Sequence, residues 1–118
     1  MQVHAITRNI NMSAQKMREV VRQIQGMKAA DAQAVLAVVC RKSARFVAKT
    51  LDSAIANAED QARTRKVPHF QSEKLWVQSA VAGTASTAGR KRFTPKARGS
   101  AGPIVKRTCH IKIVLSDE

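Results

Sequence analysis

Hydrophobic and polar residues alternate near the start of the chain. Between residues 2 and 10, Val3 and Ala5 fall on one side of an extended backbone and the residues between them on the other. Successive side chains of a strand point to opposite faces, so this alternation predicts a strand with one buried face. The same pattern assigns Ile10 to the opposite, mixed face, together with Arg8.

Three segments with helical spacing follow. The first helix is predicted to begin after Ser13, whose hydroxyl can cap an unpaired amide, and to end at Gly26, where a left-handed backbone is favourable. A short second helix is predicted from a cap at Asp31, and a long third helix from about residue 41 to residue 62. The apolar stripe of the first helix recurs three and four residues apart. Its members are Met17, Val20, Val21 and Ile24.

Two further alternating segments predict strands near the end of the chain. In residues 74–82, alternation places Val81 on the same face as Val77. In residues 105–115 the alternation is cleaner, and it assigns Thr108 to the polar face. Both segments therefore have the pattern of half-buried sheet.

The segment between these two strands has an unusual composition. Residues 83–103 read GTASTAGRKRFTPKARGSAGP, with four glycines, two prolines and no acidic residue. Almost no apolar side chain could anchor this segment to a core, and an irregular loop of this length is uncommon in a compact domain without a function. The segment is therefore either disordered or a long extension that folds against a partner.

The charge of the chain indicates that partner. Its 118 residues, a length typical of one domain, carry 21 Lys and Arg against 8 Asp and Glu, for a net charge of +13. A polyanion would neutralise this charge and release counterions, which favours nucleic acid over an anionic membrane surface or a merely solvated loop. Arginine binds phosphate with two donors, and glycine lets backbone amides approach closely. Eight cations lie between residues 86 and 112 without a carboxylate: Arg90, Lys91, Arg92, Lys96, Arg98, Lys106, Arg107 and Lys112.

Catalytic and metal-binding chemistry have little support in the sequence. Cys109 and His110 are adjacent in a predicted strand, so their side chains point apart, and both Cys109 and Cys40 are interpreted as small core residues. His4 and His69 are isolated, and no Cys/His group has zinc spacing. No stretch reaches the roughly 20 apolar residues of a membrane span. We therefore predict no enzymatic activity, no cofactor, no metal and no membrane.

A family resemblance is carried by three blocks. From Arg90 to its end, the chain resembles the C-terminal signature of the large-subunit ribosomal protein twenty-two family of bacteria and organelles. This stretch reads RKRFTPKARGSAGPIVKRTCHIKIVLSDE. MSAQKMREVVRQIQG at residues 12–26 resembles its first helix, and FVAKTLDSAIANAE at residues 46–59 its long helix. The chain departs from the family pattern at Ala14, Ser100, Gly102-Pro103 and Cys109.

This resemblance implies an α+β fold. Three helices would pack on a small three-stranded antiparallel sheet, two strands of which extend into a long β-hairpin. The chain would form a single domain over residues 1–118. Residues 1–82 and 106–118 would make the globular part and residues 83–105 the hairpin.

The resemblance also implies a role. The protein would be a structural component of the large ribosomal subunit, in bacterial cytoplasm or an organelle, that binds ribosomal RNA and neighbouring ribosomal proteins. Its hairpin would help line the nascent-peptide exit tunnel and touch the nascent peptide transiently. A DNA-binding architectural protein is the alternative.

Individual residues follow from the chain's charge and from this resemblance. Lys16, Arg18 and Arg22 point to different sides of their helix, which suits several RNA segments better than one DNA groove. The predicted RNA-binding residues are Arg8, Lys16, Arg18, Arg22, Arg90, Lys91, Arg92, Lys96, Arg98, Lys106, Arg107 and His110. The residues predicted to face the tunnel at the hairpin tip are Arg90, Lys91, Arg92, Phe93 and Pro95.

Overall fold

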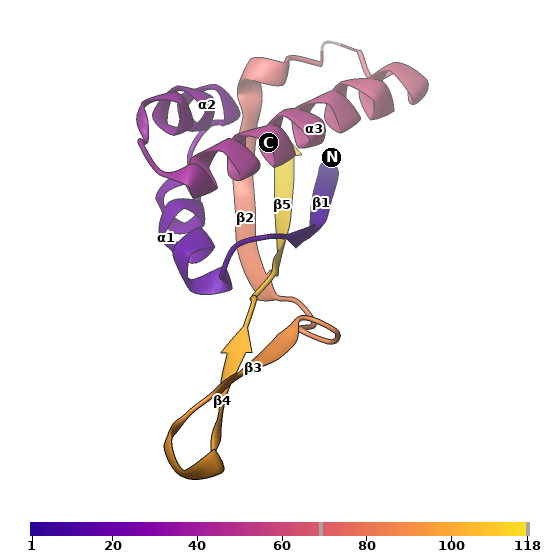
Figure 1. The fold of residues 1–118 in the computed structure, drawn as a ribbon. Coiled ribbons are helices and arrows are strands. Elements are labelled where there is room, and N and C mark those ends of the chain that lie inside the picture. Colours follow the sequence, from indigo (N-terminus) through magenta and orange to yellow (C-terminus); the bar gives the residue numbers. More distant parts are fainter. Residues whose placement is uncertain (69, 118) are drawn as a thin grey trace.

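Within residues 1–68 and 70–117, which the computed structural model describes, three α-helices cover one face of a three-stranded sheet (Figure 1). Helix α1 packs on β2, and α3 packs on β1 and β5. The predicted α+β class is therefore confirmed. In chain order the elements are β1 (Gln2–Ile10), α1 (Ala14–Ile24), α2 (Ala29–Val38), α3 (Lys42–Thr64), η1 (Ser72–Lys74), β2 (Leu75–Thr84), β3 (Lys91–Pro95), η2 (Ala97–Gly99), β4 (Ala101–Val105) and β5 (Cys109–Asp117).

The core lies between the sheet and the helices. Strand β5 is central in the antiparallel order β1-β5-β2, so its inward side chains are covered on every side. Ile111, Ile113 and Leu115 are fully buried. At about 1.5–3 kcal/mol for each large apolar side chain, such burial is the main force that holds the helices on the sheet.

Helix α1 forms as the sequence predicts. The Ser13 hydroxyl accepts from the Lys16 amide at 3.5 Å, and Gly26 adopts a φ of +79° after the last turn. The four residues of the apolar stripe are buried. Their burial places Lys16 on the outer side of the helix.

The predicted cap of the second helix is wrong. Helix α2 begins at Ala29, after Lys28, and Asp31 lies in its first turn, where a carboxylate complements the helix dipole instead of capping it. Helix α3 begins at Lys42, within the predicted range, and continues to Thr64, two residues beyond the predicted end at residue 62.

At two irregularities in the sheet, a side chain lies on the face opposite to the predicted one. Ile10 is buried because the β1–β5 register shifts between Thr7 and Ile10, where Asn9 has a φ of +56°. Val81 is 54% exposed because the β2–β5 register shifts just after Val77. An extra residue in one strand turns every later side chain to the other face, and strict alternation in the sequence does not show it.

The predicted exposure of Thr108 is also wrong. This side chain is buried, and its hydroxyl lies 3.3 Å from the carbonyl oxygen of Ser86, to which it donates. The backbone carbonyl of Thr108 in turn accepts from the amide of Ala85 at 3.0 Å. These two bonds close the base of the extension, because they join the chain that leaves β2 to the chain that enters β5.

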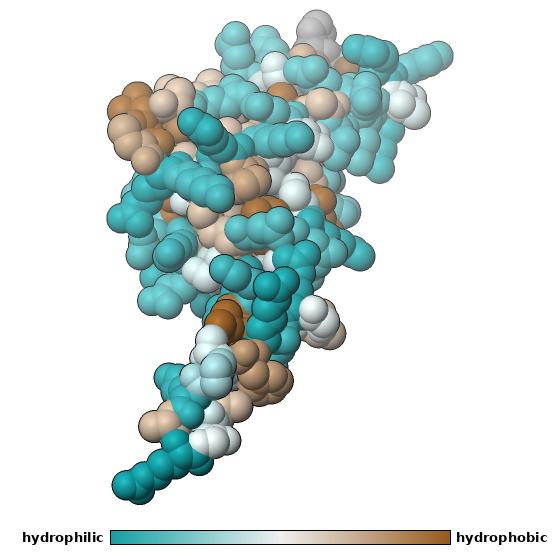
Figure 2. Space-filling model, in the orientation of Figure 1, coloured by the Kyte–Doolittle hydropathy of each residue, from teal (hydrophilic) through white to brown (hydrophobic). Residues whose placement is uncertain are grey.

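The extension is a β-hairpin in the structure. Strands β3 and β4 pair with each other alone, and we call residues 85–108 the arm and the rest of the described chain the body. Figure 1 shows the arm pointing away from the helices, and the molecule measures 70 × 28 × 16 Å. Figure 2 shows apolar surface along the arm, with a hydrophilic end.

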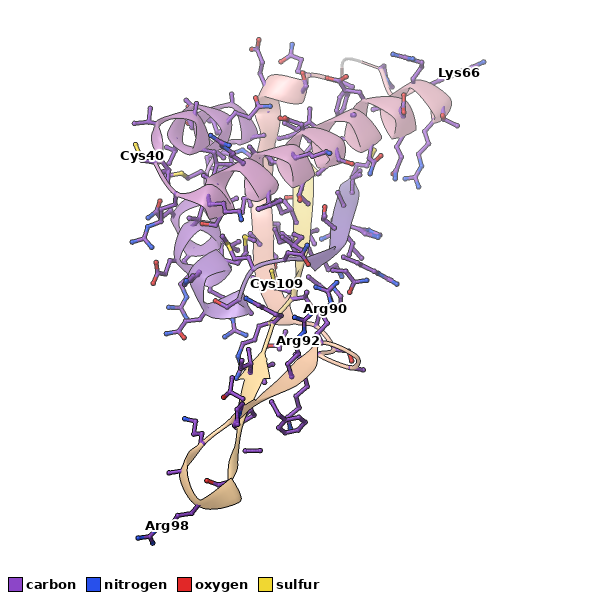
Figure 3. The ribbon with its side chains drawn as sticks, viewed as in Figure 1. Cys40, Lys66, Arg90, Arg92, Arg98 and Cys109 are labelled. Atoms are coloured by element: carbon purple, nitrogen blue, oxygen red, sulfur yellow. The ribbon has the colours of Figure 1, made fainter. Side chains whose placement is uncertain are left out.

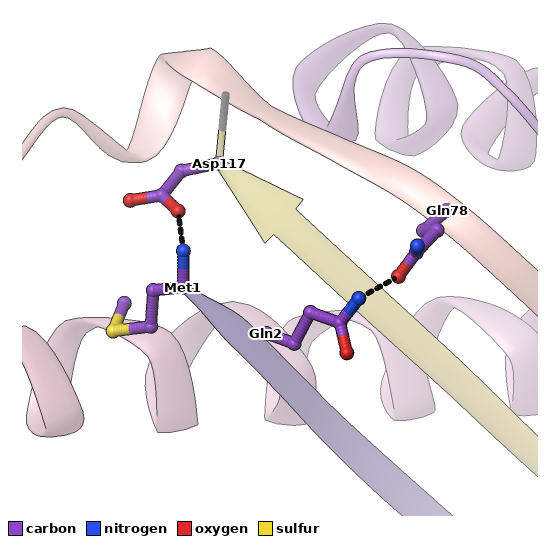
Figure 4. A network of polar contacts seen from close by, with 4 residues as sticks. All are labelled: Met1, Gln2, Gln78 and Asp117. Carbon is purple, nitrogen blue, oxygen red and sulfur yellow. Dashed lines mark hydrogen bonds and ion pairs between the residues drawn. The ribbon is translucent and has the colours of Figure 1, made fainter.

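The end of the sheet opposite the arm is closed by polar contacts (Figure 4). The amino group of Met1 forms an ion pair with the carboxylate of Asp117, which joins β1 to β5. The side-chain nitrogen Nε2 of Gln2 donates to the side-chain oxygen Oε1 of Gln78 at 2.9 Å, across β5. All three strands are thereby tied together at this end.

Candidate nucleic-acid interface

A hollow of about 570 Å³ lies where the arm joins the body. Five cationic side chains line it, and they come from α1, from α3 and from both sides of the arm's base. We call this hollow the junction pocket. Its lining residues are Asn11, Met12, Ser13, Lys16, Lys42, Arg90, Val105, Lys106 and Arg107.

Local structure orients these cations. Lys16 is in the first turn of α1, just after the Ser13 cap, and Lys42 is the first residue of α3. The Arg90 guanidinium donates to the Asn11 side-chain oxygen at 2.6 Å. The pocket is thus formed by two helix starts and by an arginine anchored to the β1–α1 connection.

No carboxylate of the described chain balances this charge. The sequence has no Asp or Glu between Glu73 and Asp117. The ion pairs found in residues 1–68 and 70–117 join Met1 to Asp117, Arg41 to Glu19 and Arg63 to Asp60, and none uses a cation of the junction pocket. The first turn of α1 also lacks acidic residues. Helix N-termini attract anions, so the pocket is suited to phosphate.

A second hollow extends the basic surface along β1 and α3. It has a volume of about 470 Å³ and is lined by Arg8 and Lys49, among others. Asn11 lines both hollows, so they are neighbours. His110 lies beside this surface, because its Nδ1 accepts from the Asn9 amide at 3.1 Å. That bond leaves the opposite nitrogen of the ring as the one available to a partner.

The arm carries the remaining predicted cations. Figure 3 shows Arg90 and Arg92 near its base and Arg98 at its far end. The turn is closed by the Lys96 amide, which donates to the Ser100 carbonyl at 2.8 Å. Because the turn is Ala97–Gly99, the residues predicted as the tip, from Arg90 to Pro95, run from the base along β3 instead.

The far end of the arm has an unusual backbone. Arg98 has a φ of +56°, a left-handed conformation that glycine or asparagine adopts at lower cost. A long cation is therefore held where a smaller residue would suit the backbone better, and Figure 3 shows its side chain projecting outward.

Two predicted RNA-binding residues lie outside the junction pocket, the second hollow and the arm. Arg18 lies on α1 and its Nε donates to the Ala82 carbonyl at 3.0 Å, so it contributes to holding α1 on β2. Arg22 lies exposed in the last turn of α1. The different placement of Lys16 and Arg18 agrees with their different sides of the helix.

Sequence reasoning missed Asn11, Lys42 and Lys49. Nothing in the spacing of the sequence shows that the start of α3 lies beside the base of the arm. One signal was available. A lysine in the first helical turn is unfavourable to the helix dipole, so Lys42 at that position suggests an external anion.

The structure separates Cys109 from His110. Cys109 is buried in the core, where burial raises the pKa of its thiol, and His110 points to the opposite face. The prediction that Cys40 is a core residue is wrong, because Cys40 is exposed in the turn between α2 and α3 (Figure 3).

Among residues 1–68 and 70–117, no three His, Cys, Asp or Glu side chains gather as a metal site would require, and no helix has both the length and the apolar content to cross a membrane. His69 lies outside the described residues.

Similarity to known proteins identifies the family. The family model "Ribosomal protein L22p/L17e" matches residues 5–116. The large ribosomal subunit protein uL22 of Opitutus terrae is 47% identical over 117 residues, which cover 99% of this chain and 96% of that protein. The protein of the same name from Methylacidiphilum infernorum is 43% identical over 118 residues, covering 100% and 96%. The chain therefore belongs to the ribosomal protein L22p/L17e family, a family of large-subunit ribosomal proteins.

Proposed function

We propose that this large-subunit ribosomal protein binds ribosomal RNA through the junction pocket and the arm, with an architectural role and no catalytic one. The observation that carries the proposal is the junction pocket itself. Five cations from separate segments converge there without an acidic partner in the described chain. Like charges gathered in this way repel one another, and phosphates bound between them would remove that repulsion.

The mechanism is the fixing of RNA geometry. The junction pocket and the neighbouring hollow lined by Arg8 and Lys49 lie at the body, and the arm extends away from it, so body and arm can hold different RNA segments. The arm would reach between RNA segments and help line the peptide exit tunnel, where β3 and the turn at Arg98 would come near the nascent chain. The other predicted partners are neighbouring ribosomal proteins.

A matched pair of charge variants tests the proposal. The first replaces Lys16, Lys42 and Arg90 with Gln. The control replaces Arg63, Arg65 and Lys66 with Gln, which removes the same charge from the far end of α3 (Figure 3). Affinity for a large-subunit ribosomal RNA transcript is measured from about 50 to 200 mM salt, with duplex DNA as a competitor.

We expect the first variant to bind at least about tenfold more weakly and to lower the slope of log affinity against log salt by about 2 to 3. Each lost phosphate contact lowers that slope by roughly 0.7 to 0.9. The control should keep most of the wild-type slope. Equal losses in the two variants would show that only net charge matters, and better binding to duplex DNA than to RNA would favour the DNA-binding alternative.

A further inference from the structure

The arm is a ribbon with two different faces. Paired residues of antiparallel strands share a face, and neighbours along a strand alternate. Phe93 pairs with Pro103, and Arg92 pairs with Ile104. One face, which we call the Phe93 face, therefore carries Lys91, Phe93, Pro95, Ala101, Pro103 and Val105. The opposite face carries Arg92, Thr94, Gly102 and Ile104.

Phe93 is presented to the outside at the centre of its face. Its side chain is 64% exposed, although an aromatic ring is among the most favourable groups to bury. Pro95 follows it two residues later and Pro103 lies opposite, and each proline has a fixed φ. The ring therefore stands on a backbone with little freedom to fold back over it, which lowers the entropy lost when a partner binds.

One cation lies beside the ring and two lie on the opposite face of the ribbon, and the sequence has no Asp or Glu from residue 74 to residue 116. The Lys91 ammonium lies 5.7 Å from the centroid of the Phe93 ring, on the same face. Arg92 lies on the other face of the ribbon, and Lys96 extends along that face, because a Cβ built on Gly102 would lie 2.3 Å from its Cε. An exposed aromatic ring with a cation beside it suits a ligand that has a flat ring next to a phosphate. That ligand is a nucleotide.

We propose that Phe93 stacks on an unpaired base of the ribosomal RNA while Lys91, on the same face of the arm, holds a neighbouring phosphate. This inference rests on the proposed RNA-binding function and adds a base-stacking site to it. A base is favoured over a peptide side chain because residues 74–116 contain no acidic group, so the field around the ring attracts polyanion. The exposure of the Phe93 side chain leaves ring surface available to the base.

Three variants of the full chain separate stacking from ordinary hydrophobic contact. Phe93→Leu keeps an apolar side chain and removes the flat ring. Phe93→Trp keeps a flat ring. Ile104→Ala is the control, since Ile104 is exposed on the opposite face of the same arm. Affinity for the large-subunit RNA transcript is measured at several salt concentrations. In a Trp76→Phe background, the fluorescence of a tryptophan at position 93 is also followed.

We expect Phe93→Leu to lose about 5- to 150-fold in affinity, the usual contribution of one stacked base, with an unchanged salt slope. Phe93→Trp should bind within about twofold of wild type, and its fluorescence should be quenched by RNA. Ile104→Ala should bind like wild type.

The outcomes distinguish this inference from the function on which it rests. Wild-type affinity in Phe93→Leu would overturn the stacking site and leave the phosphate-binding function intact. Equal losses in Phe93→Leu and Ile104→Ala would also overturn it. If Phe93→Leu binds RNA normally but contacts nascent peptide less in crosslinking, the ring faces the peptide and the stacking site is wrong. Failure of the wild-type protein to bind RNA would reject the proposed function itself.

Discussion

Inward-facing side chains of β5 in the body are fully buried under α1 and α3, whereas nearly every side chain of the arm is exposed. Within residues 85–108, only Ala85, Gly102 and Thr108 are buried. The body is held by apolar burial and the arm by little more than backbone pairing. The stability of the fold therefore depends on the body, whereas the arm contributes to binding and little to stability, and the following experiments test that difference.

Removal of the arm should have the largest effect on binding and a small one on stability. Deletion of residues 86–104 removes five cations, each worth on the order of 1 kcal/mol or more in a charged hydrogen bond. RNA affinity should fall roughly a thousandfold, about 4 kcal/mol. The free energy of unfolding, measured with urea, should change by less than about 1 kcal/mol. A shortened chain that entered large subunits normally would contradict the role of the arm.

A core substitution should lower stability strongly, whereas a substitution on the arm should hardly change it. Ile113→Ala leaves a cavity beneath the helices and should lower the free energy of unfolding by about 2–5 kcal/mol. Ile104→Ala, on the arm, should change it by less than about 0.5 kcal/mol. Urea titration of both variants checks the contrast. A comparable loss in Ile104→Ala would mean that the arm is coupled to the core.

The buried thiol predicts a pH dependence that belongs to the body alone. Burial raises the pKa of Cys109, so above the ordinary thiol pKa of about 8.5 the unfolded chain releases this proton while the folded chain keeps it. The stability from this group is complete below that pH and is lost as pH rises, by at most about 1.4 kcal/mol per pH unit. Unfolding free energies between about pH 7.5 and 9.5 measure it. Cys109→Ala should remove the slope, and Cys40→Ala should keep it.

The smallest predicted effect concerns the far end of the arm. Arg98→Gly should relieve about 1 kcal/mol of left-handed backbone strain and also remove one phosphate contact. We expect stronger protection of the arm amides from hydrogen exchange, together with weaker RNA binding. Unchanged RNA binding would mean that the Arg98 side chain has no partner there.

The sequence predicted most of the fold because its patterns were local. Ser13, Gly26 and the alternation of β5 each have a direct structural consequence, and all three occur in the structure. The faces of Ile10 and Val81 could not be predicted, because a strand irregularity depends on the partner strand as well as on the strand's own residues. Tertiary packing decided these positions.

Only part of the candidate site could be predicted, because sequence patterns report local structure and not how distant segments meet. The cations of the arm are visible as a run in the sequence, whereas the junction pocket depends on how distant segments meet. Lys42 and Arg90 are far apart in the chain, and only the packing of α3 beside the base of the arm places both in one hollow. The exposed Cys40 is a further example, since it lies beside the valines of α2 and yet outside the core.

The hydrogen bonds of Thr108 with Ala85 and Ser86 close the narrow base at which a long, thin extension leaves the body. Mechanically the extension is a lever, so a small rotation at its base is amplified into a large displacement of Arg98. The accuracy with which that guanidinium is positioned is therefore determined by what it touches at the far end, and the body sets only its direction.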